Sequence, residues 1–155
     1  MHEVFREFIE SLEPSFQRLM RMEPASVAAL PQEMPRAGIY LFSEGKEPLY
    51  VGRTNTIRNR LQNHCRPSSG HNSATFAFRL ARQITGMTQA TYTAEGSRLH
   101  LERDPRFSEV FTAQKQRVRN MNVRFVSEPD PMRQALLEIY VAVSLGTLHN
   151  DFDNH

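Results

Sequence analysis

The stretch GIYLFSEGKEPLYVG, at residues 38–52, decides the fold. Its first part, residues 38–42, is rich in β-branched and aromatic side chains, and so is its last part, residues 49–52. The polar segment between these parts contains Gly45. Two short strands that are joined by a short glycine-containing loop are typical of a β-hairpin. The stretch therefore predicts a hairpin.

Downstream of the hairpin, apolar residues recur mostly at helical spacing. The pattern predicts helices over residues 55–64, 74–84, 105–119 and 131–145, and a third strand at 123–126. Thr54 or Asn55 can cap the first of these helices. The last one starts at Asp130-Pro131, a capping carboxylate before a first-turn proline, and Gly146 ends it. Residues 86–104 give no clear pattern, and Thr91-Tyr92-Thr93 fits a strand and a helix equally.

This order of elements predicts an α/β fold in which helices flank a small three-stranded antiparallel sheet. Upstream of the hairpin, the sequence predicts an amphipathic helix over residues 3–12 and a second short helix over 15–22, interrupted by Pro14. Three prolines then mark an irregular connector. The predicted organisation is an N-terminal helical extension at residues 1–35, followed by one domain at residues 36–155.

Length and composition describe an ordinary globular chain. It has 155 residues, the usual size of one domain, and a net charge of +2 with a pI of about 9.0. This mild basic bias is compatible with a polyanionic partner and does not demand one. A single cysteine, Cys65, excludes an internal disulfide and a cysteine-rich zinc site, which fits the cytoplasm. We find no signal peptide and no apolar run that could cross a membrane.

Six polar side chains are candidates for a functional site. They are Tyr40, Tyr50, Arg60, His64, Glu138 and Asn150. Arg60 and His64 are four residues apart on the first predicted helix, so they share a face. Most of the six also have a structural explanation. Strand tyrosines usually pack, a helix arginine is usually solvated, a histidine can complement a helix dipole, and asparagine favours turns.

Glu138 is harder to explain by structure alone. It is the only formal charge between Arg133 and Asp151, in a helix that is apolar nearly all round. Such a helix is expected to be buried on most faces. A buried carboxylate needs a partner, because an unpaired buried charge is costly. A metal ion or an arginine would serve.

Gly38-Ile39-Tyr40, followed after nine residues by Tyr50-Val51-Gly52, resembles the signature of the GIY-YIG endonuclease family, with Val51 in place of isoleucine. The resemblance extends in outline from Ala37 to Asn150. It implies that Arg60 and His64 are the catalytic arginine and histidine of the first helix. It also implies that Glu138 is the metal ligand and that Asn150 completes the site, with Asn154 as a weaker candidate.

The family resemblance implies a metal-dependent endonuclease that hydrolyses phosphodiester bonds in DNA. Magnesium or manganese would bind at Glu138, and a single carboxylate suffices because magnesium keeps several waters. Arg60 would stabilise the charged phosphate. Tyr40 is our choice as general base, although the base can equally be His64. Tyr50 would orient water or phosphate, and Asn150 would fix the tyrosines or the phosphate.

Basic residues near the proposed site predict contacts with DNA. Arg53, Arg58 and Arg66 are the chosen contacts, and Arg79 and Arg82 lie nearby in sequence. A second basic group, which contains Lys115, Arg117, Arg119 and Arg124, is as compatible with a solvated helix face. The expected partner is double-stranded or branched DNA, bound by a monomer or a homodimer. No membrane partner is expected. The rival interpretations are a related fold that binds without cutting, and an unrelated α/β domain.

Overall fold

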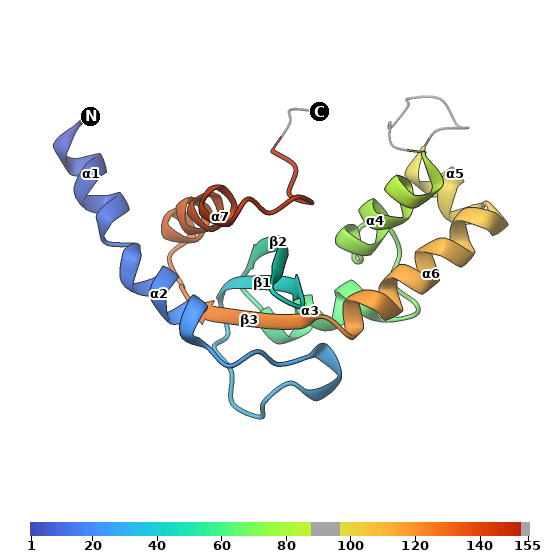
Figure 1. The fold of residues 1–155 in the computed structure, drawn as a ribbon, viewed down its shortest axis with the longest axis horizontal. Coiled ribbons are helices and arrows are strands. Elements are labelled where there is room, and N and C mark those ends of the chain that lie inside the picture. Colours follow the sequence, from blue (N-terminus) through green and yellow to red (C-terminus); the bar gives the residue numbers. More distant parts are fainter. Residues whose placement is uncertain (88–96, 153–155) are drawn as a thin grey trace. The chain divides into compact units, whose positions relative to one another are not determined.

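The computed structural model describes residues 1–87 and 97–152 (Figure 1). The chain divides into two compact units. Unit 1 consists of residues 1–58 together with the chain from Asn122 onward, and unit 2 consists of residues 59–121. Unit 1 contains the sheet, whereas the described part of unit 2 is helical. The predicted boundary between residues 35 and 36 stays a prediction.

The sheet of unit 1 has three antiparallel strands in the order β2-β1-β3. They are β1 (Gly38–Glu44), β2 (Glu47–Thr54) and β3 (Asn122–Ser127). The α/β class with a three-stranded antiparallel sheet is thereby confirmed, and so is the hairpin, whose turn lies between Glu44 and Glu47. The register shifts between Phe42 and Ser43, where β1 and β2 continue beyond the predicted strands.

Helix α7 (Pro131–Leu145) covers one face of this sheet and begins and ends where the sequence predicts. The Asp130 carboxylate accepts a hydrogen bond from the backbone N–H of Arg133 at 2.8 Å, which caps the helix. Gly146 follows the last turn. The core between helix and sheet consists of Leu12, Leu19, Ile39, Leu41, Val51, Val126, Leu137, Val141 and Ala142.

The expectation that α7 is buried on most faces is wrong. Met132, Ile139 and Val143 are 64%, 45% and 76% exposed. The sheet covers only the side of the helix that carries Leu137 and Val141, and an apolar composition does not by itself provide a second layer. The exposed apolar side chains explain why the sequence overstated the burial of this helix.

The N-terminal segment packs on the same core. It forms α1 (Glu3–Glu10), α2 (Glu13–Arg21) and a short 3-10 helix, η1 (Val27–Ala29). Pro14 lies in the first turn of α2, where proline is tolerated because that N–H has no helical partner. Helix α2 contacts β3 and α7. Ala25 then exchanges two backbone hydrogen bonds with Val123, which covers the outer edge of β3.

Unit 2 contains most of α3 (Ile57–Cys65), together with α4 (Thr75–Thr85), α5 (Arg98–Arg103) and α6 (Pro105–Arg119). Figure 1 shows α4 beside α6, and the two helices pack through an aromatic cluster. The cluster consists of Phe78, Phe107 and Phe111, whose ring centroids lie 5.1 to 6.2 Å apart. Helix α5 was not predicted, although Ser97 caps it by accepting from the N–H of His100. The ambiguous Thr91-Tyr92-Thr93 lies outside the described residues.

Among the described residues, no helix is long and apolar enough to cross a membrane.

Candidate functional site

Tyr40 and Tyr50 lie on one face of the sheet, opposite the face that packs against α7. Tyr40 pairs with Gly52 and Tyr50 pairs with Phe42, and side chains of directly paired residues point to the same face. The two phenol rings have centroids 6.4 Å apart. The Tyr40 side chain is buried, and that of Tyr50 is partly exposed. The structure thus brings the two predicted tyrosines together.

The glycines of the two signature triplets are required by close packing. A Cβ atom on Gly52 would lie 2.2 Å from the hydroxyl oxygen of Tyr40, and one on Gly38 would lie 1.9 Å from the carbonyl oxygen of Val126. Real Cβ contacts are essentially never shorter than 3.0 Å. Gly52 therefore lets the Tyr40 phenol lie across β2, and Gly38 lets β3 approach β1.

Asn150 binds the backbone of β2 at the outer edge of the sheet. Its Oδ1 accepts from the N–H of Val51 at 2.8 Å, and its Nδ2 donates to the carbonyl of Val51 at 2.7 Å. The backbone N–H of His149 donates to the carbonyl of Leu49 at 3.1 Å. These bonds act as a substitute for a neighbouring strand. Asn150 therefore holds the residue between Tyr50 and Gly52, which supports a role in fixing the tyrosine strand.

Glu138 has an arginine partner in this structure. The Nε of Arg53 donates to Oε2 of Glu138 at 3.1 Å, and the two side chains are 48% and 20% exposed. Burial raises the pKa of Glu138, and the charge and the hydrogen bond of Arg53 oppose that shift. Of the two partners considered for Glu138, a metal ion or an arginine, the structure contains the arginine. That arginine is Arg53, which is also a predicted DNA contact.

The position of Glu138 is compatible with a divalent cation. Among the residues that the structure describes, no group of three or more histidine, cysteine or acidic side chains could hold a metal. A cation at Glu138 would then need water and phosphate oxygens as its other ligands, which suits magnesium. The carboxylate is partly exposed, and its Oε1 accepts no hydrogen bond from the described residues. The donor set therefore fits the predicted ion without identifying it.

Glu138 and the two phenols reach β2 from opposite faces. Arg53 pairs with Ile39, whose side chain belongs to the core under α7, whereas Gly52 lies beneath Tyr40. The acid and the first phenol therefore meet the strand at consecutive residues. Their convergence on one cleft stays a prediction.

Arg60 lies in unit 2, in the middle of α3. Its NH1 donates to the carbonyl of Ser73 at 3.0 Å, and its NH2 donates to the hydroxyl of Thr75 at 3.0 Å. A guanidinium has five N–H donors in one plane, so these two bonds fix the plane and leave donors over for a phosphate.

His64 lies one turn after Arg60 on the same helix and is fully buried. Burial lowers its pKa well below the ordinary value, and the charge of Arg60 lowers it further. The imidazole is therefore neutral near pH 7. The burial and the positive charge that keep the ring neutral also oppose its protonation, so the task of proton acceptor stays a prediction for this residue.

Several of the predicted basic contacts are already engaged within the protein. Arg58 donates through NH2 to the carbonyls of Pro31 and Gln32. In the second basic group, Lys115 is buried and bonded to the carbonyls of Pro67 and Ser69, and Arg124 donates to the carbonyl of Met22. Neither residue lies on a solvated helix face, because Lys115 is buried and Arg124 belongs to β3.

The other basic candidates stay untested. Arg66, in unit 2, is exposed at the end of α3. DNA contacts through Arg53, Arg58 and Arg66 stay predictions.

Sequence reasoning missed the residues that hold Arg60. Ser73 and Thr75 stand thirteen and fifteen positions further along the chain, in a loop and at the start of α4. No local pattern marks a carbonyl as the acceptor for a distant arginine. The only available signal was the polar segment after Pro67, which the sequence identifies as a connector.

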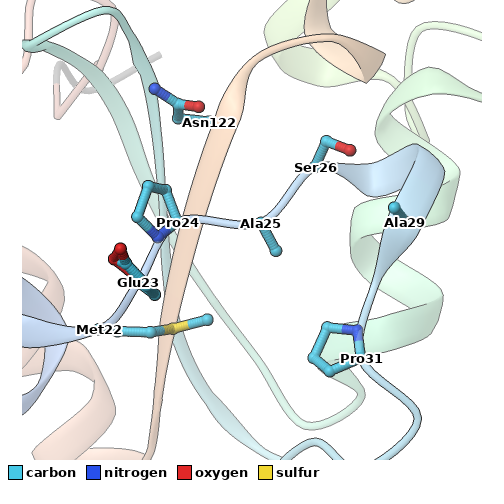
Figure 2. A pocket seen from close by; sticks show the side chains of 8 residues that line it. All are labelled: Met22, Glu23, Pro24, Ala25, Ser26, Ala29, Pro31 and Asn122. Carbon is cyan, nitrogen blue, oxygen red and sulfur yellow. The ribbon is translucent and has the colours of Figure 1, made fainter.

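An open pocket lies beside β3 in unit 1 (Figure 2). Its lining comes from the connector between Met22 and Pro31 and from Asn122, with Glu23 as its charged side chain. The lining contains none of the candidate site residues, so this pocket is separate from the proposed chemistry.

Comparison with known protein families finds a match in the region that contains the hairpin. Residues 36–103 match the family described as the GIY-YIG catalytic domain. The matched segment contains Tyr40, Tyr50, Arg60 and His64, whereas Glu138 and Asn150 lie beyond it. No curated protein and no solved structure matches this chain.

Proposed function

We propose that this chain is a GIY-YIG endonuclease, a divalent-metal-dependent enzyme that cuts DNA, because its residues 36–103 match the GIY-YIG catalytic domain. The family consists of phosphodiester hydrolases, and its members act on DNA. The observation that carries the proposal for this chain is the arrangement of β1 and β2. Two phenols lie 6.4 Å apart, one of them across Gly52, on a strand that Asn150 holds at its edge.

Hydrolysis requires an activated water and stabilisation of charge on the phosphate. Glu138 would hold magnesium or manganese through its carboxylate. Such a cation, when bound, supplies positive charge for the phosphate and for the departing 3′ oxygen. The planar donor fork of Arg60 would bind the non-bridging phosphate oxygens, because its geometry matches theirs.

Tyr40 is proposed as the general base, with His64 as the proton acceptor or as the base itself. A phenol ordinarily titrates near pH ~10 and needs a neighbour that lowers its pKa or takes its proton. Tyr50 would orient the water or the phosphate, and Asn150 would act through the backbone of β2.

A second candidate function is supported by the Arg53–Glu138 ion pair. A carboxylate whose charge is already compensated by an arginine needs no metal ion. Such a pair is expected in a domain that binds DNA without cutting it. The two candidates differ in one measurable property, the divalent-cation dependence of strand cleavage.

The substrate and the assembly belong to the same proposal. The substrate would be double-stranded or branched DNA in the cytoplasm. One active site cuts one strand, so a monomer would nick the duplex, and a double-strand break would need a homodimer or two successive events.

The test is plasmid nicking with magnesium or manganese and with EDTA. We expect cation-dependent cleavage by the wild type and none by Glu138→Ala, which should still fold and bind DNA. Glu109→Ala, at an exposed acid of α6, is the matched control and should cut like the wild type. Arg60→Ala should lower turnover by about 10²-fold or more, as the loss of other electrostatic stabilisers does. Wild-type cleavage by Glu138→Ala would refute the proposed metal ligand.

A further inference from the structure

The loop between α3 and α4, residues 66–74, is held at three places within unit 2. One is the buried ammonium group of Lys115, one is the contact of His71 with Glu102, and one is Arg60 itself. Such a density of polar side-chain contacts on a short connector is unusual, because connectors are generally the most mobile part of a fold.

Lys115 is the least exposed of the side chains that hold the loop. It is only 6% exposed, and its Nζ donates to the carbonyls of Pro67 at 2.7 Å and Ser69 at 3.0 Å. The ammonium also lies 4.5 Å from the ring centroid of Phe111. Burying a lysine is costly unless its charge is hydrogen-bonded, so this side chain is committed to the start of the loop.

The middle of the loop is fixed by a contact between His71 and Glu102. Nδ1 of His71 is bonded to Oε2 of Glu102, and both side chains are about one-fifth exposed. The ring of His71 also packs near Phe78, with centroids 5.8 Å apart. Helices α4, α5 and α6 therefore all contribute a side chain that contacts the loop or packs beside it.

The end of the loop holds Arg60. The backbone turns at Gly70, whose carbonyl accepts from the N–H groups of Ser73 at 3.1 Å and Ala74 at 2.9 Å. This turn sets the direction of the Ser73 carbonyl, which accepts from Arg60, while Thr75 accepts the second bond. The turn therefore links the part of the loop that Lys115 holds to the carbonyl that accepts from Arg60.

We infer that Lys115 is a positioning residue for the nuclease reaction, because it fixes the loop that orients Arg60. The inference rests on the proposed function, in which Arg60 stabilises the scissile phosphate. It assigns to α6, beyond the residues matched by the family, a task in aligning the arginine of α3. The same task explains why this segment contains a buried lysine where an apolar residue would fit the core better.

The test is a double-mutant cycle on plasmid nicking, with Lys115→Met and Arg60→Ala alone and combined. Lys115→Met should lower kcat roughly 10- to 100-fold with little change in KM, since small misplacements of a catalytic group have effects of this size. In the Arg60→Ala background the same change should alter kcat by less than about threefold, because a residue that acts through Arg60 has nothing left to position. Lys46→Met, at the only other lysine, is the matched control and should leave kcat unchanged.

Equal losses of kcat in both backgrounds would overturn the inference, because the lysine would then act independently of Arg60. An unchanged kcat in the Lys115→Met variant would overturn it as well. Wild-type activity of Arg60→Ala would instead refute the proposed role of the arginine.

Two further measurements keep the inference testable if Lys115→Met does not fold or the wild type does not cut. Thr75→Val removes one acceptor of Arg60 directly and should show the same cycle, with Thr85→Val at the other end of α4 as its control. The NMR signal of the Arg60 Nε–H group should shift in Lys115→Met and stay in place in Lys46→Met. If the Arg60 signal kept its chemical shift in both Lys115→Met and Thr75→Val, the inference would be overturned without any cleavage assay.

Discussion

Replacing Asn150 tests how the edge of the sheet is held. Asn150→Ala removes two neutral hydrogen bonds, 2.8 Å and 2.7 Å long, to the N–H and the carbonyl of Val51. Each such bond contributes a net ~0.5–1.5 kcal/mol, so we expect a loss of roughly 1–3 kcal/mol in the free energy of unfolding. The outer edge of β2 would keep only the bond from His149 to Leu49 among the contacts described there.

Asn150→Asp distinguishes the contributions of the two hydrogen bonds, because the side chain keeps almost the same shape. The carboxylate can still accept from the N–H of Val51, but its second oxygen faces the carbonyl of Val51, where the amide donated. At neutral pH this variant should be at least as unstable as Asn150→Ala. In acid the protonated carboxyl can donate again, so its pKa in the folded protein is raised above the unfolded value. The deficit relative to the wild type should therefore shrink as the pH falls through that raised pKa and should be smallest below about pH 4.

Urea denaturation of the wild type and both variants, between pH 3 and pH 7, measures these differences. Asn59→Ala, at an exposed position of α3, is the control and should change the free energy of unfolding by less than ~0.5 kcal/mol. If Asn150→Asp matched the wild type at pH 7, or lost stability in acid faster than the wild type, Asn150 would not donate to β2. Nicking activity should fall in both variants, because the strand that carries Tyr50 would lose its clamp.

Three further predictions concern buried groups. Burial raises the pKa of Glu138, so the stability that this group contributes is present below about pH 4.5 and is lost as the pH rises through the folded pKa. Without metal, Glu138→Gln should therefore be more stable than the wild type at pH 7, as measured by urea denaturation with EDTA. A less stable variant would contradict this prediction. Burial lowers the pKa of His64, so the free energy of unfolding should fall as the pH drops below about 6.5. In His64→Phe the free energy of unfolding should depend less on pH in this range. An unchanged pH dependence would show that other groups cause it. Gly52→Ala places a Cβ 2.2 Å from the hydroxyl oxygen and 2.3 Å from Cζ of Tyr40, so thermal unfolding should show a loss of ~1–3 kcal/mol that Tyr40→Phe does not rescue; full rescue would mean that only the hydroxyl is displaced.

The sequence determined the features that depend on short-range chemistry. Residues 38–52 alone predict the hairpin, because two runs of strand-forming residues around a glycine-containing loop need no distant partner. The same holds for α7, since Asp130 caps its start and Gly146 follows its end within the local chain. The two tyrosines and the Arg60–His64 pair could be identified because each set shares a short, recognisable spacing.

Only the tertiary structure decided what each polar group binds. Glu138 needed a partner on any interpretation, but 85 residues separate it from Arg53. Asn150 was expected to fix the tyrosines or the phosphate, and only the fold shows that its amide binds the backbone of Val51, 99 positions away. Lys115 is part of a basic cluster in the sequence and a buried anchor in the structure.

The physical reason for this division is the range of the forces involved. Helix caps, turns and strand propensity act over a few residues, so the order of amino acids contains them directly. The partner of a buried charge or amide is set by which distant backbone or side-chain atoms the packed core brings within about 3 Å, and hydrogen bonding is lost beyond that range. The apolar surface of α7 follows the same rule. The composition of the helix indicates that it can be buried, but only the packing decides which of its sides is buried.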